Sequence, residues 1–245
     1  MKIRIKFRKY GNMKFIGHLD VMRYFQKAIR RADVGIRYSE GFSPHQIMSF
    51  AAPLGVGITS EGEYLDIEVV PPEEGCHLTE RLNAVMAEGF EVVGCFKLPD
   101  SAANAMSIVA AADYQLTLRP GYEVEQPEEW VQGLLDFYGQ DEVLISKKTK
   151  KGEKQLDLKQ LVYELSASME DGSPVIFMKI STGSTENIKP ELVLDAYYQH
   201  RGEERPAFAW MTCRREVYAD LAPEQKKEQG LHQFIPLMDL GETIA

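Results

Sequence analysis

The sequence predicts an α+β protein made of two tandem ferredoxin-like βαββαβ domains with antiparallel sheets. Over the first hundred residues, periods of two and of 3.6 alternate in the order β, α, β, β, α, β, which is the split βαβ arrangement. A second cycle follows, and 245 residues with 44% hydrophobic composition suit two modest cores. We expect domains at 1–100 and 113–218, a connector at 101–112 and a C-terminal tail at 219–245.

The elements of the first domain follow from these periodicities. A strand is predicted at 2–9, where charged and apolar side chains alternate, and a helix at 17–32, where Leu19, Phe25 and Ile29 recur at helical spacing. The remaining elements are short strands near 36–38 and 47–51, a strand at 64–70 ended by two prolines, a helix at 78–87 and a strand at 90–98. We expect helices on one face of this sheet and an open second face.

The second domain repeats this order, with clearer strands than helices. Its predicted elements are a strand at 114–118, a helix at 128–137, strands at 142–146, 162–166 and 175–181, a helix at 190–198 and a strand at 211–218. The turn residues at 170–173 indicate a hairpin. Pro190 fits the first turn of a helix, and the polar tail is expected to be loosely ordered.

The formal net charge of −9 combines two regions of opposite sign. Residues 1–50 contain 11 lysines and arginines against 3 acidic residues, a balance of +8, whereas residues 51–245 contain the remaining 17 against 34, a balance of −17. Such asymmetry favours nucleic-acid contact by the basic part. The acidic part favours solubility and limits indiscriminate binding.

The strongest charge pattern lies in the first strand. Four cations alternate there with apolar residues, so at a period of two they share one face. They are Lys2, Arg4, Lys6 and Arg8. Such a row can follow a polyanion backbone, and we expect it to attract phosphates together with Arg23 and Arg37. The alternative is a solvated face, or an edge strand whose lysines prevent unwanted pairing.

Two further segments belong to the predicted nucleic-acid site. The turn at 38–45 would shape a pocket and supply aromatic rings for base stacking; its candidate residues are Tyr38, Phe42, Ser43 and His45. A lysine-rich hairpin tip around residue 152 is a second basic island, or simply a solvated loop. Its candidate contacts are Lys148, Lys151 and Lys154.

Several classes of protein are not expected. Cys76, Cys95 and Cys213 lie far apart without a C-x-x-C pair, so the sequence predicts neither a disulfide framework nor a zinc or clustered iron–sulfur site. No metal and no cofactor are expected. The chain has no phosphate-loop sequence, nucleophile elbow or H-E-x-x-H motif. With neither a signal peptide nor a membrane span predicted, we expect a cytoplasmic protein without membrane contact.

A combination of short motifs occupies the first 70 residues. They are Gly17-His18-Leu19-Asp20, the segment 38–45 with Gly41 and Pro44, Ser49-Phe50, the segment 53–57 with Gly55, and Glu63-Tyr64-Leu65-Asp66. In this combination the chain resembles the uncharacterised radical-SAM-associated family, a domain of unknown function. Weaker similarity at 157–158 and 189–190 extends the resemblance over most of the chain.

The resemblance implies a chain that works with a radical-SAM enzyme, the partner for which the family is named. Many relatives have an arginine-rich Pro-x-Pro turn where this chain has Pro44-His45-Gln46, so anion contacts by arginine are not carried over to this turn. The first half is also similar in outline to repeat-associated RNA-binding proteins of CRISPR systems, which pair ferredoxin-like domains. This is an analogy of fold, and it favours RNA on the sheet face or in a cleft.

The leading interpretation is a non-catalytic RNA-binding or substrate-presenting accessory protein for a radical-SAM enzyme, acting in RNA or ribosome modification. One alternative is a protein–protein adaptor whose acidic later half docks the partner enzyme. Another is a metal-independent ribonuclease in which His18 and His45 act as base and acid. Against the ribonuclease, a histidine at the position of His18 is more often a hydrogen-bonded structural group, and Asp20 fits the first turn of a helix or an ion pair with Arg23.

Overall fold

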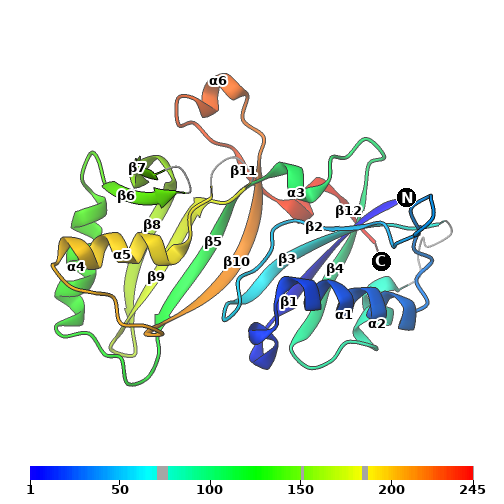
Figure 1. Cartoon of the computed structure of the whole chain (residues 1–245), viewed down its shortest axis with the longest axis horizontal. Coiled ribbons are helices and arrows are strands. Elements are labelled where there is room, and N and C mark those ends of the chain that lie inside the picture. Colours follow the sequence, from blue (N-terminus) through cyan, green and yellow to red (C-terminus); the bar gives the residue numbers. More distant parts are fainter. Residues whose placement is uncertain (71–76, 150–151, 184–186, 245) are drawn as a thin grey trace. The chain divides into compact units, whose positions relative to one another are not determined.

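The computed structural model describes residues 1–70, 77–149, 152–183 and 187–244. The chain has a mixed α/β structure and divides into two compact units (Figure 1). The first unit consists of Met1–Ala110 and Arg214–Ala245, and the second of Ala111–Cys213. Two segments of the chain, before and after the second unit, therefore build the first.

The first unit contains a sheet in the order β12-β4-β1-β3-β10, with β2 beside β3 and β11 beside β10. Its strands are β1 (Lys2–Lys9), β2 (Met48–Phe50), β3 (Thr59–Glu68), β4 (Phe90–Leu98), β10 (Trp210–Asp220), β11 (Phe234–Pro236) and β12 (Glu242–Thr243). Its helices are η1 (Gly11–Phe15), α1 (His18–Arg31), α2 (Leu78–Asn83), α3 (Ala105–Ile108), α6 (Glu224–Lys227) and η3 (Leu237–Leu240). Strand β1 pairs antiparallel with both β3 and β4.

The helices α1 and α2 lie on the same face of this sheet (Figure 1). The alternation in β1 places its apolar side chains on that face, where Phe7 packs against Phe25 of α1 with ring centroids 4.5 Å apart. Helix α1 begins after Gly17 with Asp20 in its first turn and ends with two arginines in its last turn, which suits the helix dipole. The apolar residues that the two periodicities predict for the strand and the helix thus pack together in one core.

The opposite face of β1, predicted to be open, is covered. Arg4 donates from Nη1 to the carbonyl oxygen of Leu237, 3.0 Å away, and Lys6 approaches the sulfur of Met238 at 3.4 Å. Leu237 itself is fully buried. Residues 219–245, predicted as a loosely ordered tail, therefore carry β11, η3 and β12 and belong to the first unit. Their apolar run is short and follows a charged stretch, which gives the whole segment the composition of a polar tail.

One glycine permits the close approach of β3 to β10. A Cβ built at Gly62 would lie 2.7 Å from the backbone oxygen of Arg215 and 3.0 Å from the Cα of Glu216. Any larger residue at this position would push the two strands apart. The contact matters because β10 supplies the charged side chains of Arg214 and Glu216 to the first unit.

In the second unit, the sheet strands β5, β9 and β8 follow one another, and the beginning of β10 lies beside β5. Its strands are β5 (Val109–Leu118), β6 (Leu144–Thr149), β7 (Gly152–Asp157), β8 (Val162–Glu170) and β9 (Ser173–Ser181). Its helices are α4 (Pro127–Tyr138), η2 (Leu158–Gln160) and α5 (Pro190–His200). The predicted hairpin turn joins β8 to β9. The predicted strand at 142–146 corresponds to β6, which pairs with β7 in a separate two-stranded sheet.

The helices α4 and α5 pack closely in the second unit (Figure 1). A Cβ at Gly133 of α4 would lie 2.4 Å from the hydroxyl oxygen of Tyr197 on α5. That hydroxyl donates to the carbonyl oxygen of Trp130 at 2.8 Å. A small residue in α4 thus allows a hydrogen bond that joins the two helices.

The mixed class and the predominantly antiparallel pairing agree with the prediction, whereas the tandem ferredoxin-like arrangement stays a prediction.

In the part of the chain that the structure describes, no helix combines the length and the hydrophobicity needed to cross a bilayer. Cys95 is a buried free thiol whose pKa burial raises to about 11, and Cys76 lies outside the described residues. Cys95 is thus a free thiol within the hydrophobic core of the first unit.

Candidate functional site

The predicted basic row of β1 lies in a buried network of ion pairs. Arg4 is 1% exposed and donates from Nε and Nη2 to the two carboxylate oxygens of Asp66, at 2.7 and 2.9 Å. Lys6 donates to Oε2 of Glu216 at 2.5 Å, and the hydroxyl of Tyr64 donates to Oε1 of the same residue at 2.6 Å. Both central cations of the row are therefore neutralised inside the first unit.

The two ends of the row are also engaged. Lys2 donates from Nζ to the carbonyl oxygen of Ala102 at 2.8 Å, and Arg8 pairs with Glu91 at 3.1 Å, with both side chains half-exposed. The expectation that this row lies on an open face of the sheet is thus wrong, because Arg4 and Lys6 are buried. The physical reason is that the partners of Arg4 and Lys6 come from β3 and β10, far away in sequence, and periodicity within one strand cannot reveal them.

A second buried cluster surrounds the start of α1. Arg214 forms a bidentate pair with Glu63, with Nε 2.7 Å from Oε1, and Ser60 donates to the same oxygen at 2.6 Å. Lys9 is buried and donates from Nζ to the carbonyl oxygen of Ile16 at 3.1 Å. Burial lowers the pKa of Lys9, an effect that Glu63 opposes and Arg214 reinforces.

The motif residues Gly17, His18 and Glu63 meet at this cluster. Gly17 precedes the first residue of α1, and the ring of His18 lies edge-on to Phe50 with centroids 5.1 Å apart. Desolvation lowers the pKa of His18, the carboxylate of Glu63 opposes this shift and Lys9 adds to it. The arrangement organises the beginning of α1 and favours a neutral His18.

The two candidate catalytic histidines have separate neighbours. His45 is exposed, and its Nδ1 lies 2.8 Å from the hydroxyl oxygen of Ser39. His18 and His45 make no hydrogen bond, ion pair or ring contact with each other. The structure does not bring them together as an acid–base pair. The predicted alternative for Asp20 is present, since it pairs with Arg23 at 3.2 Å on the surface.

The exposed cations lie on α1. We call Arg23, Lys27, Arg30 and Arg31 the α1 cationic face. The first three follow at i, i+4 and i+7, so they share one side of the helix, and all four are exposed or partly exposed. Arg30 and Arg31 donate to the backbone oxygens of Gln26 and Val85. Neither contact involves a carboxylate, so neither neutralises the charge of the arginine.

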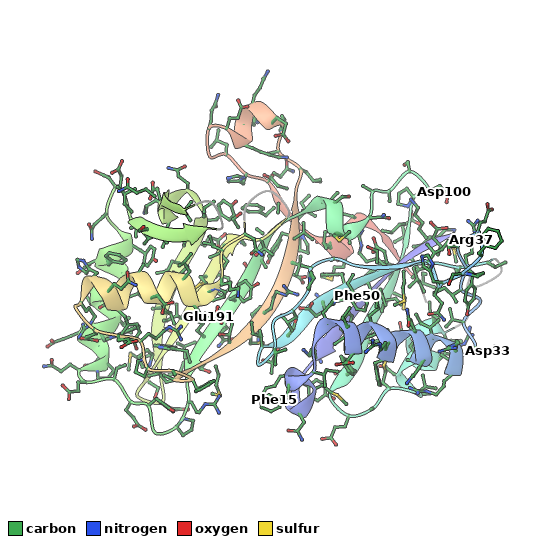
Figure 2. The ribbon with its side chains drawn as sticks, in the orientation of Figure 1. Phe15, Asp33, Arg37, Phe50, Asp100 and Glu191 are labelled. Atoms are coloured by element: carbon green, nitrogen blue, oxygen red, sulfur yellow. The ribbon has the colours of Figure 1, made fainter. Side chains whose placement is uncertain are left out.

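The segment 37–45 continues from the end of this helix. Arg37 lies beyond the C-terminal end of α1, whereas Phe15 lies at its N-terminal end (Figure 2). Arg37 is exposed and pairs with Glu68 at 3.1 Å. Tyr38 is 48% exposed and Phe42 is fully exposed. The loop turns at Gly41, whose φ of +109° favours glycine, and Ser43 and Pro44 are exposed within it.

A polar pocket of about 200 Å³ lies beside this loop; we call it the Gln46 pocket. Its polar lining residues are Lys2, His45, Gln46, Ser49, Asp66, Glu68 and Asn104. Gln46 is 6% exposed and donates from Nε2 to the carbonyl oxygen of Gln26 on α1 at 3.3 Å. Its Oε1 is buried without a hydrogen-bond partner. Gln46 therefore lines the pocket and is also hydrogen-bonded to α1.

The remaining predicted residues contribute less to the site. Gly55 lies in a loop against Ile58. The backbones of Lys148 and Lys154 lie on β6 and β7, but their side chains, and Lys151 altogether, lie outside the described residues. Across the described ranges, no group of three or more histidines, cysteines and acidic residues is placed to hold a metal ion.

Sequence reasoning missed Arg214, Glu216 and Gln46. The first two had a weak signal, because residues 213–216 place charges of both signs on one predicted strand. Gln46 carried no signal, since an amide in a turn is common and its burial comes from contact with α1. The cations of α1 lie within the helix predicted at 17–32. Their exposure could not be predicted, because it depends on which side of the helix packs against the sheet.

A model of one protein family matches residues 2–190, and the chain belongs to that family, the uncharacterized proteins conserved in bacteria, DUF2344. No curated protein matches the sequence. Among solved structures, a Cbf5-Nop10-Gar1 complex contains a similar chain, with 10% identity, a TM-score of 0.46, and coverage of 88% of this chain and 48% of that one. This protein thus spans about half the length of that chain.

An unknown protein from Galdieria sulphuraria is also similar, with 13% identity, a TM-score of 0.24, and coverage of 84% of this chain and 98% of the other.

The buried pair of Arg4 and Asp66 gives a stability prediction. Asp66→Asn removes the counter-charge of a cation that stays buried, so the free energy of unfolding should fall by about 3–5 kcal/mol in urea denaturation. Glu91→Gln is the matched control, because its pair with Arg8 is half-exposed and should contribute at most about 1 kcal/mol. Equal losses in the two variants would contradict the buried network.

The surroundings of His18 give a pH prediction. Because the folded protein lowers the pKa of His18 below its ordinary value of 6.5, the unfolded chain binds this proton more readily. The contribution of this site to stability should be complete above pH 6.5 and should decline as the pH falls through the lowered pKa. NMR titration, with the signal assigned by its loss in His18→Gln, should give a midpoint below 6.5. A midpoint at or above that value would refute the described environment.

Proposed function

We propose that this member of the DUF2344 family is a non-catalytic RNA-binding or substrate-presenting accessory protein that works with a radical-SAM enzyme, in RNA or ribosome modification. The single observation that carries the RNA part is the α1 cationic face. The radical-SAM part rests on the resemblance carried by the motifs in residues 17–66. The interaction site proposed here is on the outer surface of α1, in place of the row on β1.

The α1 cationic face has a spacing suited to a phosphate backbone. Four residues of an α-helix rise about 6 Å, so Arg23, Lys27 and Arg30 form a row that can contact neighbouring phosphates of one strand. Among the described residues Lys27 has no hydrogen-bond or ion-pair partner, and the contacts of Arg30 and Arg31 are to backbone oxygens. These cations can therefore bind phosphates without breaking a buried pair.

The adjoining loop and pocket supply groups for unpaired bases. Tyr38 and Phe42 are exposed aromatic rings on which bases can stack. In the Gln46 pocket, the side-chain oxygens of the polar lining residues, such as those of Ser49, Glu68 and Asn104, can accept hydrogen bonds from the edge of a base. Single-stranded RNA is the polyanion that uses all three features.

We also propose that the first unit derives from a ferredoxin-like arrangement. Its strands β4, β1, β3 and β2 follow in that order, and β1 is antiparallel to both β3 and β4. This order and these directions support the split βαβ pattern. In this unit β10, β11 and β12 are additions that extend the sheet. The residues Leu237 and Met238, between β11 and β12, cover the face on which other ferredoxin-like sheets bind RNA.

The RNA proposal predicts a specific loss of binding. Lys27→Gln with Arg30→Gln should weaken binding to a fluorescein-labelled single-stranded RNA and reduce the slope of log K against log salt by about 1.4, because two phosphate contacts are lost. Fluorescence anisotropy at several salt concentrations between about 50 and 200 mM measures both quantities.

The matched control is Lys189→Gln with Lys226→Gln, which removes the same charge at exposed positions that do not belong to α1. It should leave the salt slope unchanged. If both double variants lose binding equally, only net charge matters; if the unaltered protein binds no RNA at low salt, the RNA function is rejected.

An adaptor function is the second candidate, because exposed apolar side chains gather at the start of α1. Phe15, Leu19 and Val56 are 62%, 59% and 63% exposed. The backbone amide of Gly57 donates to the carbonyl oxygen of Lys14 at 2.7 Å, which joins the loop of Val56 to the segment of Phe15. Exposed apolar groups brought together in this way are typical of a protein interface.

The adaptor function predicts that Leu19→Glu abolishes copurification with the radical-SAM partner enzyme, since a carboxylate would be desolvated in the interface. Leu221→Glu is the control, because Leu221 is 49% exposed at another position. Co-expression and affinity purification measure the complex. Retention of the complex by the Leu19 variant, or its loss in both, would exclude this patch as the docking surface.

A further inference from the structure

The second unit contains an aromatic cluster with the only two tryptophans of the chain. Trp130 and Trp210 are stacked, with ring centroids 5.4 Å apart, and Tyr198 contacts Trp130 at 5.8 Å. The cluster already accommodates a cation at its edge, because the guanidinium carbon of Arg201 lies 5.8 Å from the ring centroid of Tyr197.

Trp130 and Tyr198 line a pocket of about 650 Å³, which we call the Trp130 pocket. This volume is within the range of ligand-binding sites. The acidic lining residues are Glu123, Glu125, Glu203 and Glu204. Arg201 is the one basic lining residue, and Glu203 pairs with it at 2.8 Å. In the described part of the chain, the carboxylates of Glu125 and Glu204 have no hydrogen-bond or ion-pair partner, so the pocket retains negative charge.

An independent observation is the indole N–H of Trp130. Trp130 is 2% exposed, and its Nε1 is buried without a hydrogen-bond acceptor. The indole N–H of Trp210, by contrast, donates to the hydroxyl of Tyr198 at 3.2 Å. A buried donor without an acceptor is unfavourable. An acceptor brought by a ligand, with a small adjustment of the pocket wall, would satisfy it.

We infer that the Trp130 pocket binds the side chain of a lysine or arginine presented by a peptide. The aromatic wall and the free carboxylates select a cation. The unpaired N–H of Trp130 selects a carbonyl oxygen, which a peptide carries close to the cationic side chain and a simple amine lacks. This site lies wholly within the second unit and is independent of the function proposed for the first.

Intrinsic fluorescence tests this inference directly, because Trp130 and Trp210 are the only tryptophans and both belong to the cluster. The full chain is titrated with N-acetyl-glycyl-lysyl-glycinamide, its arginyl and glutaminyl analogues, and butylamine. The lysyl or arginyl peptide should give a saturable change. Butylamine should bind more weakly than the lysyl peptide, and the glutaminyl peptide should give no saturable change.

Two variants locate the binding. Glu125→Gln with Glu204→Gln should raise the Kd for the better cationic peptide about tenfold. Glu170→Gln with Glu228→Gln, the control of equal charge at exposed positions outside the pocket, should leave it unchanged. Trp130→Phe keeps an aromatic wall but removes the N–H, so it should abolish the advantage of the lysyl peptide over butylamine.

Four results would overturn the inference. They are no saturable change with either cationic peptide, equal binding of the glutaminyl peptide, equal affinity for butylamine and the lysyl peptide, and equal losses in the two glutamate double variants. Near-ultraviolet circular dichroism checks the packing of each variant. If Trp130→Phe does not fold, the glutamate variants still decide, because their side chains lie outside the core.

Discussion

The structure of the first unit depends on the neutralisation of cations that its own sheet buries. A strand that alternates lysine and arginine with isoleucine and phenylalanine can pack one face against helices only if its other face is solvated or supplied with carboxylates. Here Asp66 and Glu216 supply them, from β3 and β10. This pairing explains why the C-terminal segment is needed on that face and why nucleic acid cannot reach Arg4 and Lys6 there without separating ion pairs.

Burial of these cations moves the candidate interaction surface to α1. Its cationic residues face away from the core, next to a loop with exposed rings and a polar pocket. The same helix begins beside the buried cluster of Lys9, Glu63 and Arg214, so the motif residues near Gly17 set the position of the helix while its outer side remains free to bind. The beginning of α1 thus has a structural role, and its outer side has the proposed binding role.

The sequence predicted local structure better than the site. The alternation in residues 2–9 and the apolar spacing in 17–32 correspond to β1 and α1, because each period is read within one element. The partners of Arg4 and Lys6 could not be predicted, since they depend on which strands become neighbours. The segment 234–240 was missed because its short apolar run follows charged residues, although Leu237 is fully buried. The unsatisfied atoms of Gln46 and Trp130 depend on packing and leave no trace in residue type.

The division of the first unit into two segments limits how this protein can be dissected. In sequence, the second unit is an insertion between Ala110 and Arg214. A truncated chain ending at residue 110 would contain Glu63 and Lys6 but lack Arg214 and Glu216, leaving one unmatched buried charge of each sign. A recombinant first unit therefore requires residues 214–245, rejoined to residue 110 through a designed linker that replaces the insertion.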